Sequence, residues 1–128
     1  MILNTDKLIR MIKDAPNGSE MKIFFYITFN QPAEGIRGFR STKEQLAIDL
    51  QLNLATIFRS LKWLKDNLLV QELKLAEDFD FMVNPYFISN NSNFDERIAE
   101  WNRRCNLDAM KEVERRRKKR LKLLKNSS

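Results

Sequence analysis

Arg59 and Lys62 carry the cationic groups that the sequence places best for binding nucleic-acid bases or phosphates. A guanidinium fork can donate to O6 and N7 of guanine, and either side chain can bind a phosphate. Both lie opposite an apolar stripe that recurs every three or four residues, formed by Ile57, Leu61, Leu64 and Leu68. This spacing predicts a helix that packs through one face and presents cations on the other. An ordinary packed helix with a solvated basic face is the simpler alternative.

A shorter predicted helix precedes this one and would position it. Ser41 or Thr42 can cap its start, with a carboxylate or amide three residues later, and the helix extends to about Leu50. Residues 51–53 have the length of a tight turn, and Asn53 can cap the second helix. Together they predict a helix-turn-helix, whose second helix enters the major groove of duplex DNA. The candidate DNA contacts are Arg40, Thr42, Lys43, Asn53, Ala55, Thr56, Arg59 and Lys62.

The flanking segments predict a mainly α fold with a small β-hairpin. An amphipathic helix that Thr5 or Asp6 can cap is expected to end at residues 15–18. The apolar run of residues 20–30 fits a buried helix, although a strand remains open. Residues 38–40 could supply a short edge strand. Residues 69–76 alternate with period two and residues 79–83 return, which predicts a hairpin. Its tip would hold Glu77, Asp78 and Asp80, carboxylates that repel phosphate, so the hairpin is expected to avoid DNA or to bind protein.

The helix-turn-helix region resembles winged-helix DNA-binding proteins. The matching residues are Leu46-Ala47, Leu50, Leu52-Asn53, Thr56-Ile57, Arg59, Leu61, Leu64 and Leu69-Val70, whereas Gln51 and Leu68 stand where that pattern has glycine. The following Val83-Asn84-Pro85 is similar to a segment of the RepL plasmid replication proteins of Gram-positive bacteria. The resemblance covers roughly residues 20–90. It implies a winged helix-turn-helix and an initiator that binds a plasmid origin and recruits host replication proteins.

Residues 94–125 contain no proline or glycine and predict a long C-terminal helix, or two helices if residues 106–108 interrupt it. Phe94, Ile98, Trp101 and Cys105 form one apolar set, and Met110, Val113, Leu121 and Leu124 form an offset second set. Such a stripe packs either within the chain or across a dimer. Because little core remains for it to cover, a homodimer seam is predicted at Ile98, Trp101, Cys105, Met110 and Val113.

The positive charge is concentrated in this C-terminal segment. Residues 103–125 hold eleven Lys or Arg against three Asp or Glu, a charge of +8 in a chain of net charge +6, so the remainder sums to −2. A six-residue cationic run consists of Arg115, Arg116, Arg117, Lys118, Lys119 and Arg120. It fits a clamp on DNA phosphates, and a solvated tail is the alternative.

The sequence lacks the residue types that most catalytic and metal-binding sites use. The chain has no His, one Cys and three Gly, which excludes Ser-His-Asp and Cys-His pairs, His-ligated metals and a P-loop. We expect a non-enzymatic, cytoplasmic protein without cofactor, metal or membrane partner. Its expected parts are an N-terminal helical extension (1–18), a winged helix-turn-helix (19–92) and a basic helix (93–128). The functions left open are replication initiator, transcriptional regulator of an operator, and protein-interaction module.

Overall fold

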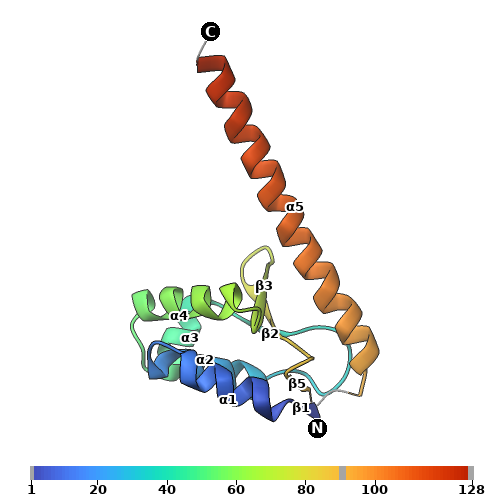
Figure 1. Ribbon diagram of the computed structural model, residues 1–128. Helices are drawn as coiled ribbons and strands as arrows, with labels where there is room; N and C mark the ends of the chain where they lie inside the picture. The colour runs from blue at the N-terminus through green and yellow to red at the C-terminus, as the bar shows by residue number, and fades with distance from the viewer. Residues whose placement is uncertain (1, 90–91, 127–128) are drawn as a thin grey trace.

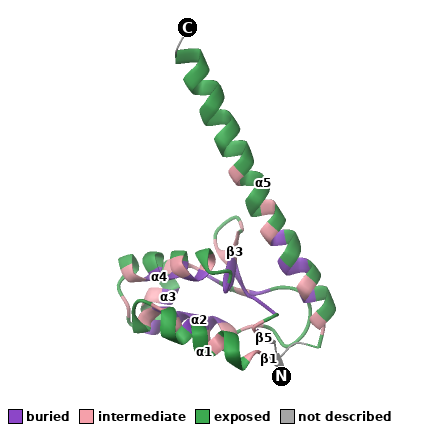
Figure 2. Cartoon of the chain, in the orientation of Figure 1, coloured by how far each residue is buried: buried purple, intermediate pink, exposed green. Residues whose placement is uncertain are grey.

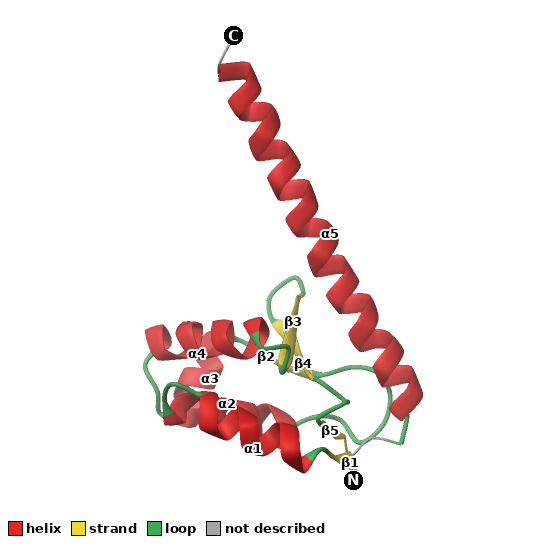
Figure 3. Ribbon diagram, in the orientation of Figure 1, coloured by secondary structure: helices red, strands yellow, loops and turns green. Residues whose placement is uncertain are grey.

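The computed structural model describes residues 2–89 and 92–126, which form a mainly helical structure with small antiparallel sheets (Figure 1, Figure 3). The helices are α1 (Thr5–Asp14), α2 (Gly18–Phe29), α3 (Lys43–Leu50), α4 (Leu54–Asp66) and α5 (Phe94–Asn126). The strands are β1 (Ile2–Leu3), β2 (Phe39–Ser41), β3 (Val70–Lys74), β4 (Phe79–Val83) and β5 (Ile88–Ser89). None of these helices has the length and apolarity that a membrane crossing requires.

Side-chain caps start both helices of the α3–α4 pair, as the sequence predicts. The Thr42 hydroxyl accepts a hydrogen bond from the backbone N–H of Gln45 (2.9 Å), and the Asn53 side-chain carbonyl accepts one from the N–H of Thr56 (2.8 Å). Each satisfies an N–H group that the first helical turn leaves unpaired. The cap positions fix where the turn ends and where α4 begins.

The two positions that lack the expected glycine adopt left-handed backbone conformations. Gln51, the C-cap of α3, has φ 54°, and Leu68, just after α4, has φ 56°. Glycine adopts this region without the steric cost that a Cβ brings. The turns therefore keep the geometry that glycine would favour, at a local cost in strain.

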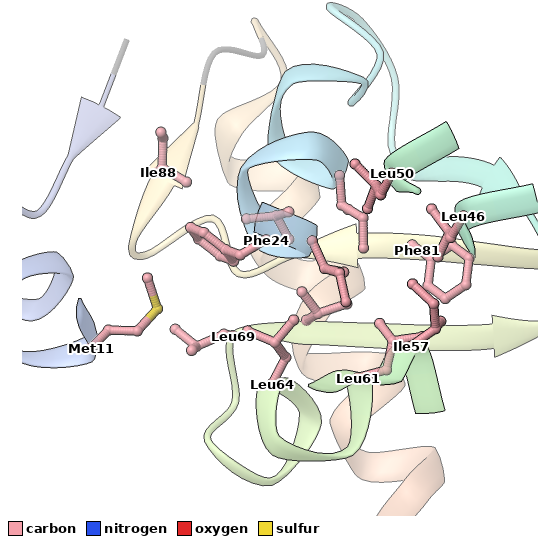
Figure 4. Close-up of a cluster of buried hydrophobic side chains, with 14 residues drawn as sticks. Met11, Phe24, Leu46, Leu50, Ile57, Leu61, Leu64, Leu69, Phe81 and Ile88 are labelled. Atoms are coloured by element: carbon pink, nitrogen blue, oxygen red, sulfur yellow. The ribbon is translucent and has the colours of Figure 1, made fainter. Parts of the chain in front are cut away.

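The core lies between α2, α3, α4 and the inner face of the three-stranded sheet (Figure 4). Residues 18–29 form a helix and not a strand, with Ile23, Phe24 and Ile27 fully buried. The helix is not buried on every side, because Phe29 is 78% exposed. Met11 of α1 belongs to the same core cluster, so the N-terminal extension packs on the central part of the chain.

The three-stranded sheet has the order β2-β4-β3, and all its pairs are antiparallel. The predicted edge strand and hairpin are therefore confirmed, with β2 and β3 as the two edges. Phe81 and Val70 point into the core, whereas Asp80 and Gln71 occupy the opposite, outer face because side chains alternate along a strand. Helix α5 packs on this outer face.

Gly38 lies too close to β4 to accept a side chain. A Cβ there would clash with the Phe81 carbonyl oxygen and an Asp80 carboxylate oxygen and would lie 2.6 Å from the Phe81 carbonyl carbon. We therefore expect Gly38→Ala to lower the free energy of unfolding by about 1 to 3 kcal/mol, measured by urea denaturation. Gly18→Ala is the matched control, since its Cβ would meet nothing within 4 Å. Equal stability of the two variants would contradict the expectation.

Helix α5 is continuous through residues 106–108, so the interruption considered for this segment is absent. Its first three turns pack on the body of the chain and bury Arg97, Glu100, Trp101 and Arg104, whereas the helix beyond residue 112 is exposed (Figure 2). The premise that Trp101 lacks a partner within the chain was wrong. The sheet supplies one, and Trp101 is buried without a second copy.

A buried ionic cluster joins α5 to the sheet. Arg104 pairs with Asp80 of β4 (2.8 Å) and with Glu100 one helical turn earlier (3.0 Å), and all three side chains are at most 9% exposed. Asp80 also accepts a hydrogen bond from the backbone N–H of Gly38 (2.8 Å). Hydrogen bonds from Arg103 and Arg104 hold the pKa of Glu100 below its usual range, so the carboxylate stays ionised.

Candidate nucleic-acid interface

The outward face of α4 contains the predicted readout residues. Ala55, Arg59 and Lys62 are exposed and share one side of the helix, opposite the buried Ile57, Leu61 and Leu64. Within residues 2–89 and 92–126 the Arg59 side chain forms no ion pair, so its guanidinium is available for a ligand. Lys62 pairs with Asp66 (2.7 Å), but both side chains are largely exposed, and exposed ion pairs contribute little to the free energy of folding.

Thr42, Asn53 and Thr56, which are also predicted to contact DNA, have fewer exposed polar atoms available for a ligand. The side-chain oxygens of Thr42 and Asn53 are already used as helix caps, which leaves the Thr42 hydroxyl proton and the Asn53 amide nitrogen for a ligand. Thr56 is only partly exposed, on the flank of α4. These residues would fix the orientation of α4 more than they would read bases.

Lys43 is not on the exposed face, contrary to expectation. Its ammonium lies over the rings of Phe58 (4.6 Å) and Phe79 (4.8 Å) and 3.4 Å from a Glu72 carboxylate oxygen, and its side chain is only 15% exposed. Lys65 binds the same Glu72 oxygen at 2.6 Å. The cluster ties α3, α4 and the hairpin together through cation–π and ionic contacts. Lys43 therefore contributes to the interface between these elements, and its ammonium is less free for the predicted DNA contact than an exposed lysine would be.

The hairpin tip is less acidic than its sequence indicates. Asp80 is buried in β4 and paired with Arg104, so its assignment to the tip was wrong. Asp78 pairs with Arg40, which donates two hydrogen bonds to its carboxylate (3.0 and 3.2 Å). Glu77 is then the one carboxylate of the three without an ion pair among the described residues. The repulsion expected between this hairpin and phosphate is correspondingly weaker.

The cationic run lies on the exposed part of α5, far along the helix from the body of the chain (Figure 1). Arg115 and Arg116 pair with Glu112 (2.8 and 3.0 Å), and Arg117 lies 3.9 Å from Glu114. These are exposed pairs three or four residues apart, which support a helix and break easily. Lys118, Lys119 and Arg120 have no ion pair in the part of the chain that the structure describes. The structure does not bring this run together with Arg59.

The residues predicted for dimerisation fall into two groups. Ile98 and Cys105 are partly buried with Trp101 on the sheet side of α5, where the Gln71 amide lies 3.2 Å from the Cys105 sulfur and burial raises the pKa of this thiol. Met110 and Val113 are each 67% exposed. Of the five residues predicted for dimerisation, Met110 and Val113 are the two that present apolar surface to solvent.

Neither the role of Phe58 nor that of the buried charged residues of α5 was predicted from the sequence. The signal was present: Arg97, Trp101 and Arg104 recur at spacings of four and three residues and so share one helical face. The described residues contain no group of three or more His, Cys, Asp or Glu that could hold a metal ion. Comparisons with protein-family models, with curated proteins and with solved structures found no match.

Proposed function

We propose that this chain is a sequence-specific protein that binds double-stranded DNA as a winged helix. In this proposal α3 and α4 are the helix-turn-helix, α4 enters the major groove, and the β3–β4 hairpin is the wing. The supporting observation is the outward face of α4, where Ala55, Arg59 and Lys62 are exposed together and the guanidinium of Arg59 forms no ion pair with any residue that the structure describes. Capping by Asn53 sets the end of α4 that would face base edges.

Arg59→Ala tests the proposal at its most informative residue. Loss of a bidentate contact should weaken binding to the specific duplex by about 1 to 3 kcal/mol, measured by fluorescence anisotropy with a labelled site selected from random sequences. Arg59→Lys should recover only part of this loss, because an ammonium keeps the charge and lacks the planar fork. Lys22→Ala, which removes an exposed cation from α2, should leave specificity intact. An Arg59→Ala isotherm that matches the parent's, with helix content unchanged by circular dichroism, would reject the assignment.

For the biological role we propose initiation of plasmid replication at an origin, on the basis of the resemblance to RepL proteins. Regulation of transcription at an operator uses the same helix-turn-helix contacts and is the alternative. Deleting the coding region from its replicon separates the two, since loss of autonomous replication favours the initiator. Complementation in trans by the parent chain and by Arg59→Ala then shows whether DNA contact by α4 is required.

One observation favours a protein partner instead of DNA. Ile48 of α3 is 70% exposed, and Leu54 and Phe58 on α4 are also exposed, so apolar surface borders the proposed recognition face. Apolar side chains can contact thymine methyl groups, which keeps them compatible with DNA. If the chain selects no duplex from a random pool, this apolar surface becomes the leading candidate for a protein-binding site.

A further inference from the structure

A groove of about 390 Å³ lies between the outer face of the sheet, the loop before β2 and the packed part of α5. Leu73 and Leu75 contribute apolar surface to it. Its charged lining consists of Arg37, Arg40, Arg103 and Arg104 with Asp80 and Glu100. Four guanidinium groups against two carboxylates give the lining a charge of +2, and Asp78, which pairs with Arg40, lowers the net charge to +1.

The ionic cluster divides these arginines into an inner one and an outer set. Arg104 is held by Asp80 and Glu100 and is 6% exposed, so it is a fixed part of the wall. Arg40 and Arg103 are each paired on one side, but their side chains are 55% and 54% exposed. Arg37 is exposed and makes no ion pair within residues 2–89 and 92–126. The outer guanidinium groups therefore have donors left for an anion.

The position of the Arg37 loop is fixed, which makes the groove a built feature. Arg97 of α5 donates to the backbone carbonyl oxygens of Arg37 (2.8 Å) and Gly35 (3.2 Å) and to the Gln31 side chain (2.8 Å). Arg97 is itself buried. The loop is thus tied to the same helix that supplies Arg103, and the two walls of the groove keep their relative position.

We propose that this groove binds the phosphodiester backbone of duplex DNA, through Arg37 and Arg103. The proposal rests on the function proposed above. Helices α4 and α5 lie on either side of the β3–β4 hairpin (Figure 1), and the groove lies on the α5 side. In the proposed complex α4 occupies the major groove, and a neighbouring stretch of the duplex backbone reaches the hairpin and the groove beside it. Guanidinium forks match phosphate oxygens. Along α5 the cationic run of residues 115–120 follows Arg103, separated from it by residues 105–114, which hold Lys111 and three carboxylates.

The test compares two double variants that remove the same charge. The first double variant, Arg37→Ala with Arg103→Ala, removes both guanidinium groups that are proposed to bind phosphate. Lys7→Ala with Arg10→Ala removes two exposed cations from α1, which line a separate pocket. Binding is measured with the selected duplex and with a random duplex of equal length, between about 50 and 200 mM salt. If each arginine neutralises one phosphate, the groove variant should flatten the slope of log K against log salt by about 1.8, from roughly 0.9 per contact. The α1 variant should change it by much less.

Unchanged slopes in the groove variant, or equal changes in both variants, would overturn the proposal, and the groove would then suit an acidic protein segment better. Thermal unfolding checks that both variants fold. Arg37→Ala alone, which breaks no ion pair of the described residues, supplies the answer if the double variant is unstable, with an expected change of about 0.9. Failure of the proposed function is distinct, because the parent chain would then prefer no duplex and Arg59→Ala would have no effect.

Discussion

Arg104→Met should lower the free energy of unfolding by about 3 to 5 kcal/mol, the cost of removing one partner from a buried ion pair. The substitution keeps most of the side-chain volume but leaves Asp80 and Glu100 buried without their shared cation. The expected loss is a large part of the stability of a small protein. Urea denaturation followed by circular dichroism measures it, with the midpoint and the slope fitted separately.

Arg103→Met is the matched control for this prediction. It removes the neighbouring arginine and another ion pair to the same Glu100, but its side chain is 54% exposed, so about 1 kcal/mol or less is expected. Asp80→Asn combined with Arg104→Met should recover part of the loss, because it removes the uncompensated carboxylate. Similar destabilisation by Arg103→Met and Arg104→Met would show that burial of the cluster does not determine its energetic role.

Truncation after Glu114 should produce the largest change in DNA binding. If all six cations of the run neutralise phosphates, their loss flattens the slope of log K against log salt by about 5. The advantage of the full-length chain over the truncated one should then shrink by roughly a thousandfold between about 50 and 200 mM salt. Specific and random duplexes should be affected alike, because phosphate contacts carry no sequence information.

The truncated chain keeps every buried residue of α5, so its fold should survive. A full-length variant with glutamine at residues 115–120 keeps the helix length and also keeps Lys122 and Lys125, which the truncation removes. It should reproduce the truncation if the six-residue run supplies the phosphate contacts. A solvated tail predicts the parent's slope in both variants, and that result would assign the run to another partner, such as a host replication protein.

The local elements were predictable from the sequence because their signals are local. Caps at Thr42 and Asn53 and the alternation through residues 69–76 each depend on residues within a few positions of one another. Even the missing glycines were informative, since Gln51 and Leu68 are the two non-glycine residues with positive φ among those the structure describes. The residues there are not glycine, but the backbone adopts a conformation that glycine favours.

The contacts between distant segments were not predictable in the same way. Asp80 follows the hairpin turn and, by alternation, faces away from the core, so solvent was the natural expectation. Arg104, 24 positions later in the sequence, covers that face, and nothing near Asp80 indicates it. The partial burial of Lys43 was not predicted for a similar reason, since a lysine at the start of a helix is expected to be exposed and its contacts with Phe58 and Phe79 arise only in the folded chain.

The length of α5 sets how far the cationic run extends. From Arg104, the last buried residue of the helix, to Arg115 and Arg120 is 11 and 16 residues, or about 16 and 24 Å at the helical rise of 1.5 Å per residue. Along a duplex, whose axis rises roughly 3.4 Å per base pair, this distance equals about five to seven base pairs. The helix would then act as a spacer: a protein of this size would contact DNA well outside the stretch its folded body covers, and the length of α5 would determine where that outlying contact falls.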